Sequence, residues 1–199
     1  MRPAAFLDRD GVLLRLRRDP DGARRGPRSA GEAELIEGAE SAVQDLADHG
    51  YICIVVTNQP DIARGKQTLE QLSGMNQYLR SRLAIHDIYA CCHDSPDGCR
   101  CRKPSPGMLV AAAFRHRLDL AASVMFGDRR SDALAARAAG CRFCWITADA
   151  QDAVPEHPAE ASAATLREAV TALLAEPRHV NSRRKEPIPD VGYRYLYPG

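Results

Sequence analysis

Residues 51–59 read Tyr-Ile-Cys-Ile-Val-Val-Thr-Asn-Gln, a nearly continuous apolar run that ends abruptly in a hydroxyl and two amides. A run of this length without alternating polar residues is typical of a strand buried on both faces of a parallel sheet. Ligands of such sheets bind at the carboxyl ends of the strands, where these polar side chains fall. The stretch therefore predicts both a fold class and the edge of the sheet that carries the function.

Strand-like and helix-like segments alternate along most of the chain. The predicted strands cover residues 4–7, 51–56, 88–91, 124–127 and 142–146. The predicted helices cover residues 39–49, 68–83, 105–117, 131–139 and 162–175, with Ser105 as the N-cap of the third. This alternation predicts an α/β fold with a doubly wound, Rossmann-like parallel sheet.

Length and charge bound the class of protein. The 199 residues suit one α/β domain, which we place at residues 1–176, followed by a C-terminal tail at residues 177–199. Lys and Arg number 27 against 26 Asp and Glu, so the net charge of +1 gives no general attraction to nucleic acid or to anionic membranes. No apolar run approaches the ~20 residues that cross a bilayer, and an early Asp-Arg-Asp interrupts any signal-peptide core. We therefore expect a soluble, cytoplasmic protein.

Two stretches break the alternation. Residues 15–28 carry six arginines, two prolines and two glycines, and we interpret them as a long polar loop over the site. In the tail, Tyr193, Tyr195 and Tyr197 recur at strand periodicity. The tail is either a disordered end or a segment that docks on its own domain or on a neighbouring subunit.

Acidic residues follow two of the predicted strands. Asp8 and Asp10 lie two apart, so both side chains can face one pocket, and Gly11 lets the chain turn behind them. Asp128 and Asp132 follow the strand at 124–127. Two carboxylates can divide the roles of nucleophile and acid–base group. Carboxylates that converge would repel one another without a hard cation such as Mg²⁺ between them.

Groups that can hold an oxyanion lie at two other predicted element ends. Thr57, Asn58 and Gln59 end the strand quoted above, and their hydroxyl and amides can donate to a bound anion. Arg102 and Lys103 precede the helix predicted at 105–117, where an ammonium and a guanidinium beside a helix N-terminus form an anion clamp.

Together these residues resemble a known family. Asp8-x-Asp10, Thr57, Lys103 and Gly127-Asp128-x-x-x-Asp132 resemble the four motifs of the haloacid-dehalogenase-like phosphohydrolases. Val-Thr-Asn-Gln at 56–59, Ile-Ala-Arg-Gly at 62–65 and the cysteines before Arg-Lys-Pro at 102–104 are similar to the D-glycero-D-manno-heptose 1,7-bisphosphate and histidinol-phosphate phosphatases. The resemblance covers residues 4–175 and implies that family's fold, with a zinc-stapled loop and no large cap domain. Pro60-Asp61 and the long arginine-rich stretch depart from the pattern of the heptose enzymes.

The cysteines are clustered. Four of the seven fall within residues 91–101, which indicates a metal site and not a disulfide scaffold. The resemblance implies a closed, structural zinc site whose ligands are Cys91, His93, Cys99 and Cys101. Cys92 would then be a spectator. A redox-active or accidental cluster is the alternative.

The resemblance also implies roles for the remaining candidates. Asp8 would be the nucleophile and Asp10 the general acid and base. Mg²⁺ would be held by Asp8, the backbone carbonyl of Asp10 and Asp128. Asp132 would orient Lys103 or the metal shell. The residues expected to bind phosphate or substrate are Thr57, Asn58, Gln59, Arg102, Lys103 and Arg129.

The expected function is Mg²⁺-dependent hydrolysis of a small sugar phosphate, with D-glycero-D-manno-heptose 1,7-bisphosphate, cleaved at the 7-phosphate, as the first candidate. A histidinol-phosphate or other sugar-phosphate phosphatase is the alternative within this class. A polynucleotide 3′-phosphatase could use the arginines of 15–28, but the near-neutral charge and the lack of aromatic residues among them disfavour nucleic acid. An inactive binding protein is disfavoured because all four motifs are intact.

Overall fold

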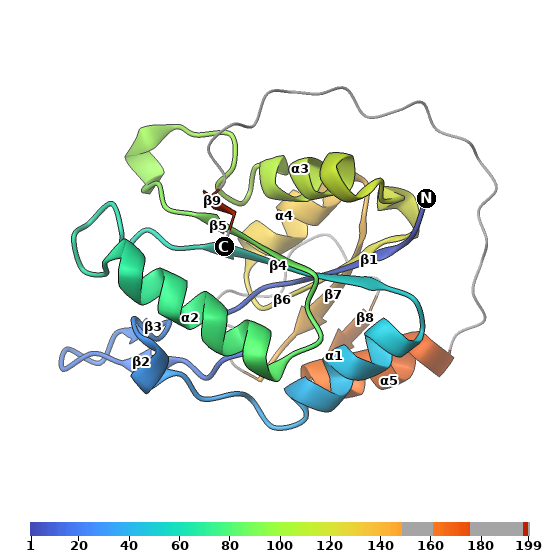
Figure 1. Ribbon diagram of the computed structural model, residues 1–199, viewed down its shortest axis with the longest axis horizontal. Coiled ribbons are helices and arrows are strands. Elements are labelled where there is room, and N and C mark those ends of the chain that lie inside the picture. The colour runs from blue at the N-terminus through green and yellow to red at the C-terminus, as the bar shows by residue number, and fades with distance from the viewer. Residues whose placement is uncertain (149–160, 176–196, 199) are drawn as a thin grey trace.

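A parallel sheet forms the centre of the computed structural model (Figure 1), which describes residues 1–148, 161–175 and 197–198. The strand order is β8-β7-β6-β1-β4-β5-β9, in which the first six strands are mutually parallel and β9 is antiparallel to β5. The strands are β1 (Ala4–Leu7), β4 (Ile52–Asn58), β5 (Asp87–Cys91), β6 (Val124–Gly127), β7 (Arg142–Ile146), β8 (Ala161–Ala163) and β9 (Tyr197–Pro198). The order confirms the predicted parallel sheet, and its five longest strands fall where the sequence placed them.

Helices cover both faces of the sheet. Figure 1 shows α3 and α4 on one face and α1, α2 and α5 on the other. The helices are α1 (Ala39–Asp48), α2 (Leu69–Arg82), α3 (Gly107–His116), α4 (Arg130–Ala139) and α5 (Leu166–Ala175), with short 3₁₀ turns at η1 (Ala30–Glu32), η2 (Ser95–Asp97) and η3 (Leu120–Ala122). This arrangement confirms the doubly wound fold, and no large cap domain is present among the described residues.

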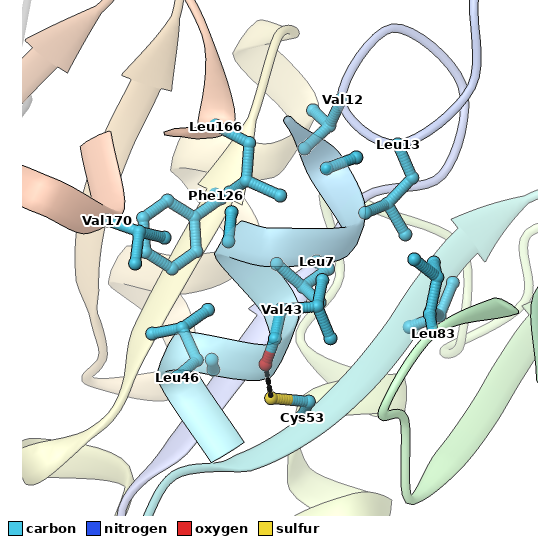
Figure 2. Close-up of a cluster of buried hydrophobic side chains, with 14 of the residues drawn as sticks. Leu7, Val12, Leu13, Val43, Leu46, Cys53, Leu83, Phe126, Leu166 and Val170 are labelled. Carbon is cyan, nitrogen blue, oxygen red and sulfur yellow. Dashed lines mark hydrogen bonds between the residues drawn. The ribbon is translucent and has the colours of Figure 1, made fainter. Parts of the chain in front are cut away.

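One of the two cores lies between the sheet and α1, α2 and α5. Figure 2 shows Leu7 and Phe126 of the sheet packed near Val43 of α1 and Val170 of α5. The thiol of Cys53 donates to the backbone carbonyl of Val43 at 3.7 Å in the same cluster. All four residues of β1 are completely buried. Because β1 is held between two layers of apolar side chains, the chain that leaves its carboxyl end starts from a fixed position.

The third helix begins one residue later than its sequence indicates. Pro106 is the N-cap of α3, and the first helical residue is Gly107. The backbone N–H of Ser105 instead donates to the carbonyl of Arg102 at 2.8 Å, so Ser105 belongs to the preceding turn. A Cβ on Gly107 would lie 2.2 Å from the carbonyl oxygen of Arg100, which shows how closely the helix start packs on that segment.

The last predicted helix, at 162–175, was too long. Ala161–Ala163 form β8, an edge strand that pairs with β7, and α5 begins only at Leu166. The hydroxyl of Thr165 accepts a hydrogen bond from the backbone N–H of Glu168 at 3.2 Å. This N-terminal capping contact ends the extended segment and starts the helix.

The arginine-rich stretch at 15–28 is not wholly irregular. It contains an antiparallel hairpin of β2 (Arg17–Arg18) and β3 (Arg24–Arg25), in which Arg18 lies opposite Arg24. The predicted polar loop therefore contains a short hairpin, and residues 24–28 of it line the pocket described below. Within the described part of the chain, no helix has the length and apolar character needed to cross a membrane.

The predicted tail at 177–199 lies outside the described residues except for Tyr197 and Pro198. Their backbone pairs with Ala90 and Tyr89 at the free edge of β5. Tyr193 and Tyr195, which define the predicted periodicity, lie outside the described residues.

Candidate active site

The candidate catalytic residues gather at the carboxyl ends of β1, β4 and β6. Asp8 follows β1, Thr57 and Asn58 end β4, and Asp128 follows β6. A pocket of about 560 Å³ opens at this edge. Of the predicted site residues, those that line it are Asp8, Asp10, Thr57, Asn58, Gln59, Cys99, Arg102, Lys103, Arg129 and Asp132. Parallel pairing of β1 with β4 and β6 brings these residues together from segments far apart in the sequence.

Lys103 is a buried cation between two carboxylates. Its Nζ lies 2.6 Å from Oδ1 of Asp8 and 2.6 Å from Oδ1 of Asp132. It also donates to the carbonyl of Val56 at 2.8 Å. Burial alone would lower the pKa of the Lys103 ammonium, but Asp132 and Asp8 outweigh burial and raise it. Of the two roles expected for Asp132, these contacts support the orienting of Lys103.

Lys103 is also held through its backbone. The side-chain amide of Asn58 donates to the Lys103 carbonyl at 3.0 Å and accepts from the Lys103 N–H at 3.0 Å. A residue at the end of β4 thus attaches the Lys103 peptide to the sheet.

Asp10 is held from two sides. Arg9 donates to it with Nε and Nη2, at 2.9 and 3.0 Å, while the Arg9 side chain is completely buried. The amide of Gln59 donates to Oδ2 of Asp10 and to Oγ1 of Thr57, both at 2.8 Å. Gln59, expected to bind substrate, therefore contacts the candidate acid–base residue directly. The sequence did not indicate this role for Arg9, because an arginine between two acidic residues is usually an exposed, solvated charge.

Three carboxylates meet without enough donors to satisfy them. One oxygen each from Asp8, Asp128 and Asp132 lie within 4.8 Å of one another. Both oxygens of Asp128 are buried and have no hydrogen-bond partner. Burial raises the pKa of Asp8 to about 6, although Lys103 opposes the shift. Burial, with the charges of Asp8 and Asp132, raises the pKa of Asp128 to about 8. Unpartnered oxygen ligands in a converging acidic set fit a hard divalent cation such as Mg²⁺.

Gly11 makes this cluster possible. Its φ is +97°, and a Cβ there would lie 2.3 Å from Oδ2 of Asp128. Any other residue would strain the backbone and displace the carboxylate, so the Asp8-Arg9-Asp10-Gly11 turn can approach β6 only with glycine at this place.

The four predicted zinc ligands also converge. The Sγ atoms of Cys91 and Cys99 are 3.7 Å apart, and that of Cys101 lies 3.4 and 3.5 Å from them. Nδ1 of His93 lies 3.6 Å from the sulfur of Cys91 and 3.3 Å from that of Cys101. Zn–S bonds of ~2.3 Å in a tetrahedron require sulfurs ~3.8 Å apart, so the spacing fits zinc. Cys101 is the centre of the cluster, because its sulfur contacts the sulfurs of Cys91 and Cys99 and Nδ1 of His93.

Several arginines line the pocket and are called here the arginine rim. Of these, only the arginines within residues 15–28 could be singled out from the sequence. Arg24, Arg25, Arg28 and Arg64 line the pocket, whereas Arg17 and Arg18 are not among the lining residues. Arg25 lies 2.6 Å from both Asp19 and Glu32, Arg28 lies 2.6 Å from Asp61, and Arg64 lies 2.7 Å from Asp94. No local pattern indicates the pairs of Arg28 with Asp61 and of Arg64 with Asp94, because each joins residues 30 or more positions apart.

Comparison with known proteins agrees with this geometry. Residues 100–173 match the family described as HAD-hydrolase-like. The chain is 37% identical over 152 residues to a D-glycero-beta-D-manno-heptose-1,7-bisphosphate 7-phosphatase of Vibrio cholerae, covering 70% of this chain and 77% of that protein. Its identity to the Salmonella typhi protein of the same name is 40% over 151 residues, covering 69% and 76%.

A solved structure gives the same result. A D,D-heptose 1,7-bisphosphate phosphatase from B. bronchiseptica, complexed with magnesium and phosphate, superimposes with a TM-score of 0.74 at 29% identity, covering 86% of this chain and 98% of that one. The resemblance expected from the motifs is confirmed by these relatives. The chain belongs to the haloacid-dehalogenase-like phosphohydrolases, in the branch of the heptose bisphosphate phosphatases, and is a phosphoric monoester hydrolase.

Proposed function

We propose that the protein removes the 7-phosphate of D-glycero-D-manno-heptose 1,7-bisphosphate in the cytoplasm, through an aspartyl-phosphate on Asp8. The observation that carries this proposal is the cluster of Asp8, Asp128 and Lys103, of which Asp8 and Lys103 line the pocket. A nucleophilic carboxylate, an unpartnered carboxylate and a buried ammonium together suit a phosphoryl group. The names of the relatives supply the sugar.

The first step forms a bond between an Asp8 oxygen and phosphorus while the bond from phosphorus to the sugar oxygen breaks. Asp10 acts as the general acid and donates a proton to the departing sugar oxygen. Lys103 lies beside Asp8 and offers a positive charge to the phosphate oxygens. Thr57, the Asn58 backbone, Arg102 and Arg129 line the pocket from which the remaining oxygens and the sugar would be held.

The second step returns the enzyme to its starting state. Asp10, now a carboxylate, takes a proton from water as the water oxygen attacks phosphorus, and the Asp8–phosphorus bond breaks to release phosphate. Gln59 and Arg9 keep the Asp10 carboxylate in one orientation for both proton transfers.

The proposal includes two metals. Asp8, the backbone carbonyl of Asp10 and Asp128 would hold Mg²⁺, which when bound offsets the negative charge gathered around phosphorus. Cys91, His93, Cys99 and Cys101 would hold a structural zinc, because four protein ligands leave no position for water. The segment between β5 and α3 has few apolar residues, so zinc would supply much of its folding free energy and hold Arg102 and Lys103 in place.

A phosphate-release assay with Mg²⁺ across a substrate panel tests the proposal. The panel contains both anomers of the heptose bisphosphate, histidinol phosphate, hexose monophosphates and a 3′-phosphorylated oligonucleotide. We expect the highest kcat/KM for the heptose bisphosphate, with the 1-phosphate retained in the product. A higher kcat/KM for histidinol phosphate or for the oligonucleotide would replace the proposed substrate, and no release from any ester would refute the phosphatase mechanism.

A further inference from the structure

Asp10 is enclosed on a third side by the arginine-rich segment. A Cβ built on Gly26 would lie 2.4 Å from both Cγ and Oδ2 of Asp10, so the Gly26 backbone packs directly on the Asp10 carboxylate. Arg9, which holds the same carboxylate, also reaches the backbone carbonyl of Pro27 at 3.5 Å. Residues 24–28, called here the clamp segment, therefore share a packed cluster with Arg9 and Asp10.

The clamp segment is attached at Arg28 to the loop that follows β4. Nε of Arg28 donates to Oδ2 of Asp61 at 2.6 Å, and the side-chain amide of Gln67 donates to the Arg28 carbonyl at 2.7 Å. Asp61 and Gln67 lie between β4 and α2, whereas the clamp segment precedes α1. Two loops from different parts of the chain thus meet at Arg28.

The charges of the rim show what these arginines do. Arg25, Arg28 and Arg64 are paired with four carboxylates, which are Asp19, Glu32, Asp61 and Asp94. Each of these three guanidinium groups is thus neutralised by at least one carboxylate, so their charges serve these pairs and not a second substrate phosphate. The pairs connect the hairpin, the loop after β4 and the segment after β5, which is what a structural attachment requires.

We propose that the clamp segment is a positioning device for Asp10: Gly26 and Arg9 confine the carboxylate, and the Arg28–Asp61 ion pair holds the segment closed on it. The inference rests on the proposed function, because it needs Asp10 to protonate the leaving oxygen and to deprotonate water. A group that transfers a proton must stay within hydrogen-bond reach of the reacting oxygen, and a displacement of ~1 Å costs about 10²-fold in rate.

The test compares two esters in single-turnover experiments that follow release of the leaving group. The heptose bisphosphate has an alkoxide leaving group that needs a proton, whereas p-nitrophenyl phosphate releases a stable phenolate that does not. Gly26→Ala, which would displace the Asp10 carboxylate, should slow release from the heptose bisphosphate by about 10²-fold and release from the nitrophenyl ester by less than ~3-fold. Gly31→Ala is the matched control, since its Cβ would meet nothing nearer than Oγ of Ser29 at 3.9 Å.

A second pair of variants tests the attachment without adding bulk. Arg28→Met removes the ion pair with Asp61, together with the longer 3.4 Å pair with Asp19, and keeps the length of the side chain, whereas Arg28→Lys keeps the charge. Arg28→Met should reproduce the selective slowing of the sugar ester, by at least ~10-fold, and Arg28→Lys should restore most of the wild-type ratio between the esters. If Gly26→Ala fails to fold, the comparison of Arg28→Met with Arg28→Lys alone tests the clamp proposal.

Asp10→Asn separates failure of the clamp from failure of the proposed function. Asp10→Asn should slow the sugar ester far more than the nitrophenyl ester. If it does, and neither Gly26→Ala nor Arg28→Met changes the ratio between the esters, the clamp is refuted and the proposed function stands. Equal slowing of both esters by Asp10→Asn would overturn the acid–base assignment of Asp10 and the clamp with it.

Discussion

Asn58 and Lys103 exchange two hydrogen bonds of 3.0 Å, from side-chain amide to backbone carbonyl and from backbone N–H to side-chain carbonyl. Asn58 ends β4, and Lys103 ends the segment that contains the candidate zinc ligands. This pair joins the sheet to that segment, and it places the Lys103 ammonium beside Asp8. The contact thus couples the folding of the cysteine cluster to the geometry of the phosphate site.

Asn58→Ala tests this coupling. The substitution leaves the Lys103 N–H and carbonyl without partners, which should lower the free energy of unfolding by about 1–3 kcal/mol. Loss of the Lys103 position should lower kcat/KM by about 10²-fold. Chemical denaturation and phosphate release measure the two effects. Asn76→Ala, in α2 and with an unpartnered side-chain oxygen, is the control for a buried asparagine outside the site. Wild-type kcat/KM in Asn58→Ala would show that Lys103 holds its place unaided.

Asp8→Asn should abolish turnover, because an amide cannot form the acyl-phosphate. The fold should remain, since Lys103 keeps its ion pair with Asp132. Acid quenching during turnover should trap a hydroxylamine-sensitive phosphoenzyme in the wild type and none in the variant, while circular dichroism reports the fold. Asp48→Asn, an exposed carboxyl at the end of α1, should leave both measurements unchanged. Substantial activity in Asp8→Asn would rule out the covalent mechanism.

The strand ends could be predicted because a buried strand gives a short, continuous apolar run in the sequence. Residues 4–7 and 124–127 are apolar runs followed at once by acidic residues, and strands so buried pair in parallel with their carboxyl ends together. The convergence of Asp8, Thr57 and Asp128 follows from that pairing. The cysteine spacing likewise predicted a compact cluster without any knowledge of the sheet.

The contacts that complete the site could not be predicted, because they join distant segments by shape and charge. The Arg28–Asp61 pair and the packing of Gly26 on Asp10 depend on how two loops cross, which no local pattern records. Arg9 was invisible for another reason. Its buried side chain is paired with the Asp10 carboxylate, and buried arginines are rare enough that composition gives no reason to expect one.

The two candidate metal sites should differ in the metal they bind and in their response to a chelator. Elemental analysis of the purified protein should find one zinc per chain, and treatment with EDTA followed by Mg²⁺ should restore activity, because the sulfur-rich site is closed and the oxygen site is open. Cys99→Ser should lose the zinc and lower Tm by at least ~5 °C. Cys92→Ser is a matched control, being adjacent to the cluster but outside its set of ligands. Absence of zinc from the wild-type protein would refute the structural zinc site.

Two arginines of the hairpin can be compared to test whether the enzyme binds the second phosphate of a bisphosphate substrate. Arg18 and Arg24 are cross-strand partners, yet only Arg24 lines the pocket, while Arg18 is exposed. Arg24→Ala should raise KM for the heptose bisphosphate about tenfold more than KM for a hexose monophosphate, because a guanidinium binds a second phosphate through charge-assisted hydrogen bonds. Arg18→Ala should change neither KM. Equal increases for both esters in Arg24→Ala would show that Arg24 does not distinguish the bisphosphate.

Truncation tests the C-terminal segment. The backbone of β9 covers the edge of β5 at Tyr89 and Ala90, immediately before the candidate zinc ligand Cys91. Removing residues 177–199 would expose the unpaired N–H and carbonyl groups of this edge, which also invites pairing with other chains. We expect a loss of ~1 kcal/mol, equivalent to ~2–4 °C in Tm for a chain of this size. Removal of residues 197–199 alone should cause most of this loss if the pairing is the reason.

Sedimentation of both truncated proteins tests where the segment docks. If it docks within its own chain, truncation leaves the oligomeric state unchanged. If it docks on a neighbouring subunit, truncation shifts the protein toward the monomer. Equal Tm and equal sedimentation for the full chain and both truncations would show that β9 contributes nothing to the stability of the sheet edge.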